Sequence, residues 1–111
     1  NSVEAGRRSF EAACAKLSGI DGVFAFHDLY AAGVLRACAK RGIRVPGDLR
    51  LVGCDNLELA AALTPALTTV DYGLEALASR ALSLLLALVS GKNAGETAVR
   101  LMPRLVVRES G

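Results

Sequence analysis

The stretch Val23-Phe24-Ala25-Phe26-His27-Asp28-Leu29-Tyr30-Ala31-Ala32-Gly33 decides the fold, because it passes from a short apolar run directly into a helix. Residues 23–26 are apolar at every position, which is typical of a parallel strand buried on both faces. Asp28 is of a type that caps helices, and we expect it to cap a helix over Leu29–Arg41 that ends at Gly42. A buried strand leading straight into a helix indicates an α/β unit.

The flanking segments repeat this alternation of helix and strand. Apolar residues at helical spacing predict helices over Ser2–Leu17, Leu57–Leu63 and up to Ser90 from a cap at Asp71. Strands are predicted over Leu49–Gly53, Leu67–Val70 and Val99–Val107. Pro103 interrupts the last of these, which indicates an edge position or a bulge. A polar loop is predicted over Lys92–Glu96. This order predicts an α/β fold with an open parallel sheet flanked by helices.

Composition limits the size and class of the protein. The chain has 111 residues, enough for one domain, and 52% of them are apolar against 22% charged, as in globular proteins. Its 13 basic and 11 acidic residues give a net charge of +2, nearly balanced in both halves. We therefore expect no direct nucleic-acid binding by this chain. No apolar run approaches the roughly 18–20 residues of a membrane span, so no membrane partner is expected.

The sequence also lacks the residue patterns of several chemistries. It has a single His, and Cys14, Cys38 and Cys54 form no CxxC pair, so no metal site, cofactor or catalytic residue is expected. The scattered cysteines fit buried thiols in a reducing cytoplasm. Gly33 and Gly53 belong to no phosphate-binding loop, and we interpret them as sites of close packing. Because the chain begins without Met or a leader, we expect it to be cut from a longer protein.

The quoted stretch resembles the strand-to-helix segment of the lactose-repressor/galactose-repressor (LacI/GalR) family of bacterial transcription regulators. Three later stretches resemble the same family in the same order: Arg44-Val45-Pro46-Gly47-Asp48 with Leu51-Val52-Gly53-Cys54-Asp55-Asn56, then residues 63–70, then residues 103–110. The resemblance implies a periplasmic binding protein-like type I domain, in which a sugar or purine-like effector binds between two lobes. Residues 1–111 would be its carboxyl-terminal part, with the DNA-binding head and most of the amino-terminal lobe absent.

Polar residues that follow the predicted strands are the candidate ligand site. In open α/β sheets, ligands bind beyond the carboxyl ends of the strands, where His27 and Asp55 stand. The resemblance assigns ligand contacts to Asp55, His27 and Asn1. Each has a structural alternative: Asp55 as a cap of the next helical turn, His27 packed between strand and helix, and Asn1 as a helix cap. We predict that Asp55 and His27 face the same crevice.

The resemblance also implies a homodimer or higher oligomer, for which Ala32, Leu35 and Leu63 are the candidate interface residues. The alternative is that these residues pack on the chain's own sheet. DNA would be reached only through the missing head. The helix over 74–90 is apolar around more than one face. We therefore expect it to be covered by another copy or to fold back on the sheet.

These observations predict an effector-sensing and dimerisation part of a cytoplasmic LacI-type regulator that performs no catalysis. One alternative is the sugar-binding protein of an importer, which shares the fold. A second alternative is an α/β enzyme, which would need a nucleophile with its base, a metal cluster or a phosphate loop.

Overall fold

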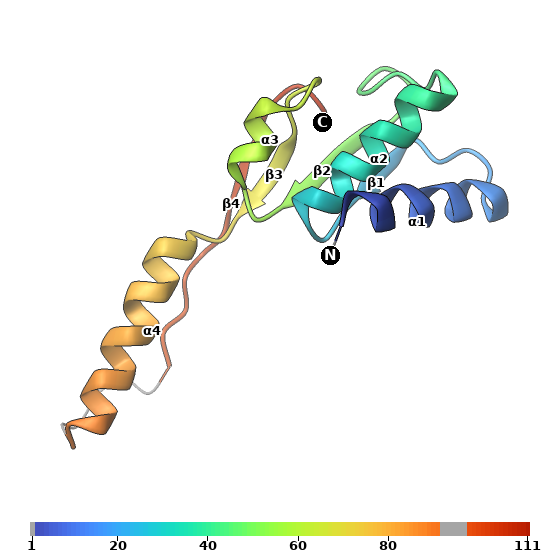
Figure 1. Ribbon diagram of the computed structural model, residues 1–111. Helices are drawn as coiled ribbons and strands as arrows, with labels where there is room; N and C mark the ends of the chain where they lie inside the picture. Colours follow the sequence, from blue (N-terminus) through green and yellow to red (C-terminus); the bar gives the residue numbers. More distant parts are fainter. Residues whose placement is uncertain (1, 92–97) are drawn as a thin grey trace.

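Helices and strands alternate along the chain as the sequence predicts (Figure 1). The computed structural model describes residues 2–91 and 98–111, so Asn1 and the predicted loop over Lys92–Glu96 lie outside the described residues. The elements are α1 (Val3–Lys16), β1 (Gly22–Phe24), α2 (Asp28–Arg41), β2 (Arg50–Cys54), α3 (Glu58–Ala62), β3 (Thr68–Asp71), α4 (Leu74–Val89) and β4 (Arg104–Val106).

The four strands form one open sheet in the order β1-β2-β3-β4. Strands β1, β2 and β3 are parallel, whereas β4 pairs with β3 in the antiparallel sense, with Val70 opposite Leu105. The prediction of an open α/β sheet flanked by helices is confirmed, but an entirely parallel sheet was wrong for β4. A parallel return requires a helix that packs back on the sheet. Helix α4 has no buried residue, and the chain after it re-enters at the edge in the opposite direction.

The core lies between the sheet and the helices α1, α2 and α3, and its side chains come from all of these elements. Its buried members are Phe10, Ala25, Ala31, Val34, Leu35, Ala37, Cys38, Leu49, Leu51, Ala60 and Leu67. Helices α1 and α2 approach closely through Gly6 and Gly33, since a methyl group on either glycine would collide with the backbone of the other helix. The interpretation of Gly33 as a site of close packing is confirmed.

The sequence predicts three buried thiols, and two of the three are buried. Cys38 and Cys54 are buried, Cys14 is half-buried, and all three are free. Burial raises the pKa of the Cys38 thiol. A raised pKa keeps this thiol protonated and unreactive.

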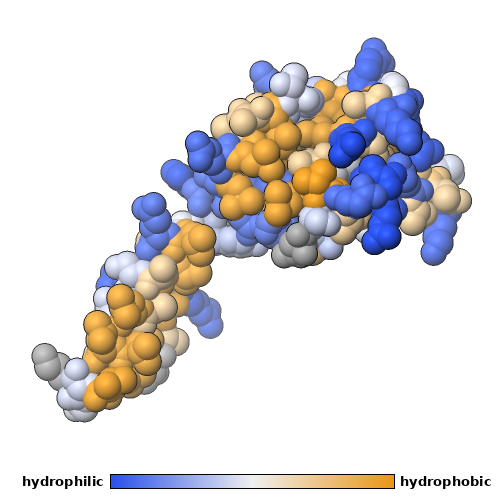
Figure 2. All heavy atoms as spheres, in the orientation of Figure 1, coloured by the Kyte–Doolittle hydropathy of each residue, from blue (hydrophilic) through white to orange (hydrophobic). Residues whose placement is uncertain are grey.

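Helix α4 projects away from the body, which gives the molecule a longest dimension of 58 Å (Figure 1). Figure 2 shows its surface dominated by apolar side chains, and those exposed are Leu74, Leu77, Leu82, Leu85, Leu86, Leu88 and Val89. The expectation that this helix folds back on the sheet was wrong, because none of its residues is buried; Leu77 and Leu84 share a groove with Val99 and Leu101 of the returning segment. Coverage by another copy stays a prediction.

The start of α4 also differs from the prediction. Asp71 does not cap the helix, because it ends β3 and its Oδ1 accepts a hydrogen bond from the backbone N–H of Gly73 at 2.8 Å. The capping position is Gly73 itself, in a left-handed conformation with φ of 65°. Within residues 2–91 and 98–111, no helix combines the length and the apolar character needed to cross a membrane.

Candidate functional site

His27 and Asp55 lie together at the carboxyl ends of two neighbouring strands. His27 follows β1 and Asp55 follows β2, and these strands are parallel and paired from Gly22 with Arg50 to Phe24 with Val52. The His27 Nε2 atom lies 3.4 Å from Asp55 Oδ2. The prediction that both side chains lie at the same edge of the sheet is confirmed, while a shared crevice and contact with a ligand stay predictions.

His27 is also the residue that caps α2. Its Nδ1 accepts a hydrogen bond from the backbone N–H of Leu29 at 3.2 Å, and its backbone is extended with φ of −155°. Because Nδ1 acts as an acceptor, the hydrogen of the neutral ring is on Nε2, which faces Asp55. The prediction that Asp28 caps this helix was therefore wrong. The imidazole is fixed by its own helix, with its Nε2 atom on the side of the Asp55 carboxylate.

Asp55 and Asn56 form a strained turn after β2. Their φ angles are 102° and 51°, in the left-handed region that residues other than glycine rarely adopt. Such conformations cost on the order of 1–3 kcal/mol each and persist only where the surroundings fix them. Here the Asp55 N–H donates to the Val70 carbonyl at 2.8 Å, and the Asn56 N–H donates to Thr69 Oγ1 at 3.3 Å. The turn therefore holds Asp55 in one place relative to β3.

The Asp55 carboxylate is only partly satisfied. Among the described residues, its Oδ2 is buried without a hydrogen-bond partner, although the His27 Nε2 atom lies 3.4 Å away. The carboxylate side chain as a whole is 27% exposed, so part of it is open to the crevice. A half-buried carboxylate of this kind favours a partner that donates hydrogen bonds.

Asn56 connects this turn to the carboxyl-terminal strand. Its Oδ1 accepts from Arg108 Nη2 at 2.8 Å, and its Nδ2 donates to Asp71 Oδ2 at 3.3 Å. The same Asp71 oxygen accepts from Arg104 at 2.9 Å. The Gly73 N–H and then the Arg104 guanidinium hold the pKa of Asp71 below its usual range. The site is thereby tied to both strands that lead to and from α4.

An open groove of about 520 Å³ lies beside Asp55 and Asn56, between the end of the sheet and the start of α4. Four of its lining residues are acidic, namely Asp55, Glu58, Asp71 and Glu75, and Arg104 is the basic one. Its lining favours ligands that donate hydrogen bonds over anions. It lies at the carboxyl ends of the parallel strands, where the predicted crevice was expected.

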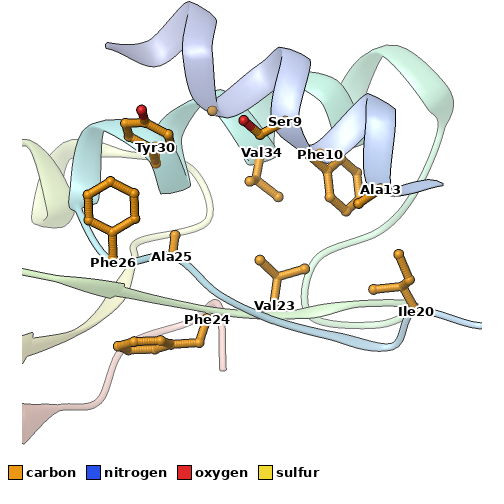
Figure 3. A pocket seen from close by; sticks show the side chains of 11 residues that line it. Ser9, Phe10, Ala13, Ile20, Val23, Phe24, Ala25, Phe26, Tyr30 and Val34 are labelled. Atoms are coloured by element: carbon orange, nitrogen blue, oxygen red, sulfur yellow. The ribbon is translucent and has the colours of Figure 1, made fainter. Parts of the chain in front are cut away.

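A second cavity of about 270 Å³ lies between α1 and β1 and is lined almost entirely by apolar side chains (Figure 3). It includes neither His27 nor Asp55. Figure 3 shows Val23 directed toward α1 and Phe24 on the opposite side of the strand, where Phe24 is 64% exposed. The prediction that this strand is buried on both faces was wrong, because the core joins α1, α2 and α3 to one face of the sheet.

A sequence model of the periplasmic binding protein-like domain matches residues 2–111. The chain belongs to the periplasmic binding protein-like family. It is 41% identical over 88 residues to the HTH-type transcriptional repressor PurR of Proteus mirabilis, an alignment that covers 79% of this chain and 26% of that protein. The chain thus spans about a quarter of this curated relative.

Solved structures of the same class superpose on nearly the whole chain. A LacI family transcriptional regulator from Arthrobacter sp. FB24, in complex with lactose, is 36% identical with a TM-score of 0.83, and covers 99% of this chain and 41% of that one. The transcriptional regulator CelR in complex with cellobiose is 29% identical with a TM-score of 0.90, and covers 99% of this chain and 34% of that one. These relatives agree with the LacI/GalR resemblance of the sequence and do not favour the importer alternative.

The remaining predicted site residues of this periplasmic binding protein-like domain are less informative. Asn1 lies outside the described residues. Ala32 and Leu35 are buried by their own chain, at 7% and 8% exposure, so they offer little area to a second copy. Leu63 is half-buried against the core. The dimer interface stays a prediction.

Sequence reasoning missed three residues that shape the site of this periplasmic binding protein-like domain. Asn56 directly follows Asp55. Asparagine tolerates a left-handed backbone, and this was the one feature of the sequence that indicated a tight turn. Tyr72 meets the site through Cys54, with the Sγ and hydroxyl oxygen 2.7 Å apart, and this hydrogen bond raises the pKa of Tyr72. Arg108 reaches Asn56 from the end of the chain, and no local pattern marks that contact.

Proposed function

We propose that this chain is the effector-sensing part of a LacI-type transcription regulator and that its effector is a sugar. The observation that carries the proposal is the meeting of His27 and Asp55 at the carboxyl ends of adjacent parallel strands. Ligands of open α/β sheets bind at this edge. The proposal is supported by the relatives, which are transcription regulators, two of them in complex with cellobiose and lactose.

The chemistry of the pair suits a polyhydroxylated ligand. The Asp55 carboxylate accepts hydrogen bonds from hydroxyl groups, and the Nε2–H of His27 donates to a hydroxyl oxygen. A sugar hydroxyl is both donor and acceptor, so one ring edge satisfies both side chains. Hydrogen bonds to a charged group contribute about 1.5–3 kcal/mol each. A purine-like effector, whose ring N–H would donate to Asp55, is the second candidate because several relatives are PurR repressors.

The proposed mechanism is a shift between conformations of a longer protein. A ligand held at this edge and against a second lobe favours one arrangement of the lobes. That arrangement changes operator binding through a DNA-binding head and a dimer contact that includes the surface around α2, α3 and Leu63. The role requires no catalysis, and the three free thiols are consistent with a place in the cytoplasm.

Ligand titration followed by NMR tests the proposal directly. His27 is the single histidine, so its ring signals are identifiable without ambiguity. We expect lactose, cellobiose or ribose at millimolar concentration to shift the His27 ring and the Asp55 and Asn56 amide signals of the 111-residue chain. Hypoxanthine tests the purine alternative in the same way.

Two variants separate binding at this site from a general effect. Asp55→Asn keeps the shape of the side chain but removes its charge, and we expect apparent affinity to fall roughly 10-fold or more, from the loss of about 1.5–3 kcal/mol. Asp21→Asn makes the same chemical change on an exposed residue at the opposite end of β1 and serves as the control. Ligand shifts that persist unchanged in Asp55→Asn, or an absence of shifts with every sugar and purine, would contradict the proposal.

A further inference from the structure

Asp28 is a fully buried carboxylate beside the candidate site. Its exposure is 0%, and it directly follows His27 at the start of α2. Its Oδ2 accepts from the backbone N–H of Leu57 at 2.8 Å, and its Oδ1 accepts from Thr69 Oγ1 at 2.6 Å. Both partners lie outside α2, one in the segment after the Asp55–Asn56 turn and one on β3. A buried carboxylate is costly unless it is fully hydrogen-bonded, so these two contacts account for its place in the core.

The two partners of Asp28 fix the strained turn from both sides. Thr69 Oγ1 donates to Asp28 and also accepts from the Asn56 N–H at 3.3 Å. The next backbone N–H, that of Leu57, donates to Asp28 itself. The consecutive N–H groups of Asn56 and Leu57 therefore donate to Thr69 and Asp28, respectively. Without these acceptors the Asn56 and Leu57 N–H groups would lose their partners, and only the bond from the Asp55 N–H to the Val70 carbonyl would still hold the turn at positive φ.

The Asp28 carboxylate occupies space that the absence of a side chain at Gly53 leaves free. Gly53 of β2 faces it, and a methyl group on this glycine would collide with Asp28 Oδ1 and with Leu67. The absence of a side chain at residue 53 thus makes room for the carboxylate inside the sheet-to-helix layer. The α2 cap is provided by His27, so Asp28 is not needed there.

We propose that Asp28 is a positioning residue for effector binding, which sets the Asp55 carboxylate against His27 by holding the Asp55–Asn56 turn. The inference rests on the proposed function, since it assigns Asp28 a role in the same ligand site. Asp28 makes no ligand contact in this scheme. It acts through the Leu57 N–H and Thr69 Oγ1, so that a change at this buried residue alters the geometry of the His27–Asp55 pair.

Four variants test the proposal. Asp28→Asn replaces one acceptor oxygen by an NH2 group, which cannot accept from Leu57 N–H or Thr69 Oγ1. Thr69→Val keeps the shape of the side chain but removes the hydroxyl, whereas Thr69→Ser keeps the hydroxyl. Asp21→Asn is the matched control, an exposed aspartate at the other end of β1.

The first readout needs no ligand. In the 111-residue chain we expect nuclear Overhauser contacts between the His27 ring and the Asp55 methylene group. Asp28→Asn and Thr69→Val should lose these contacts and shift the His27 ring signals, while the Thr69→Ser and Asp21→Asn spectra should match the original chain. If Asp28→Asn does not fold, the Thr69 pair decides. Folded Asp28→Asn or Thr69→Val variants that keep the His27–Asp55 contacts would overturn the proposal.

The second readout is affinity for lactose, measured by the same signals. We expect at least a tenfold loss in Asp28→Asn and Thr69→Val, and affinity recovered in Thr69→Ser. Unchanged affinity in both variants overturns the proposal. If the original chain binds neither lactose nor any other sugar or purine, the proposed function fails, whereas the ligand-free contacts still decide whether Asp28 positions the turn.

Discussion

Replacing Gly33 by alanine tests the close approach of α1 and α2. Helix propensity alone predicts that this change stabilises the protein, because alanine is favoured over glycine inside a helix by about 1 kcal/mol. The structure predicts the opposite sign. A methyl group at residue 33 would meet the Val3 carbonyl and the Arg7 nitrogen, which are backbone atoms of α1 and cannot rotate away. The whole of α1 would have to move.

The magnitude follows from the two opposing effects. Overpacking costs about 1–3 kcal/mol, and we expect the upper end because backbone atoms are involved. With about 1 kcal/mol returned by propensity, the free energy of unfolding should fall by about 2 kcal/mol. For a chain of 111 residues that corresponds to a Tm lowered by roughly 8 °C. Urea denaturation and thermal unfolding, followed by circular dichroism, measure both quantities.

Two further variants make the result specific to the helix contact. Gly22→Ala is the control, because nothing lies within 4 Å of a methyl group at that position, and it should leave stability nearly unchanged. Gly6→Ala enters the same contact from α1, where it would meet the Tyr30 backbone. The Gly6 and Gly33 changes together should cost less than their sum, since either one separates the helices. A Gly33→Ala protein more stable than the original would refute the reasoning.

Four other outcomes are expected. Ser110→Ala should lower the free energy of unfolding, measured in urea, by about 2 kcal/mol or more. The buried Ser110 hydroxyl donates to the Leu51 carbonyl and accepts from the Thr68 N–H, and both groups would lose that partner. Ser83→Ala on α4 is the control and should change stability little. Because the pKa of Asp71 is lowered, its contribution to stability is present above the ordinary aspartate pKa and is lost as the pH falls through the pKa of the folded state. In Arg104→Gln, NMR titration of the Asp71 carboxyl should show a higher pKa. An unchanged pKa would mean that the Arg104 pair is unimportant. The isolated chain should show no sequence-specific operator binding in fluorescence anisotropy at physiological salt, and salt-resistant specific binding would contradict this. Light scattering over a concentration series should show self-association through the exposed α4. A monomer at all concentrations would contradict this prediction.

The sequence predicted those features whose causes are local. Gly42 ends α2 with φ of 69°, as a left-handed residue after a helix should. The position of His27 and Asp55 followed from one general rule, that carboxyl ends of neighbouring parallel strands share an edge. The first depends on one residue and its neighbours, and the second on a rule that holds for every open parallel sheet.

The features that sequence reasoning missed depend on contacts between distant residues. Asp28 looked like a helix cap because its own helix follows it, yet its partners lie 29 and 41 residues further along the chain. No residue near Asp28 in the sequence indicates that its carboxylate is buried. The space for the carboxylate is provided by Gly53 on β2. The side chains of α4 indicated a helix without a partner of its own, but not the direction in which the chain would leave the sheet.

The connection of α4 to the body has a mechanical consequence. Strand β3 leads out to the helix and β4 leads back, and the two are hydrogen-bonded side by side with Asp71 opposite Arg104. A single tether would let the helix swivel about its own bond, whereas a paired ribbon resists torsion and stretching and yields most easily to bending out of its plane. We therefore expect α4 to move relative to the body mainly by tilting about the line from Asp71 to Arg104. Because Asn56 is bonded to Asp71, the axis of that tilt passes beside the turn that carries Asp55.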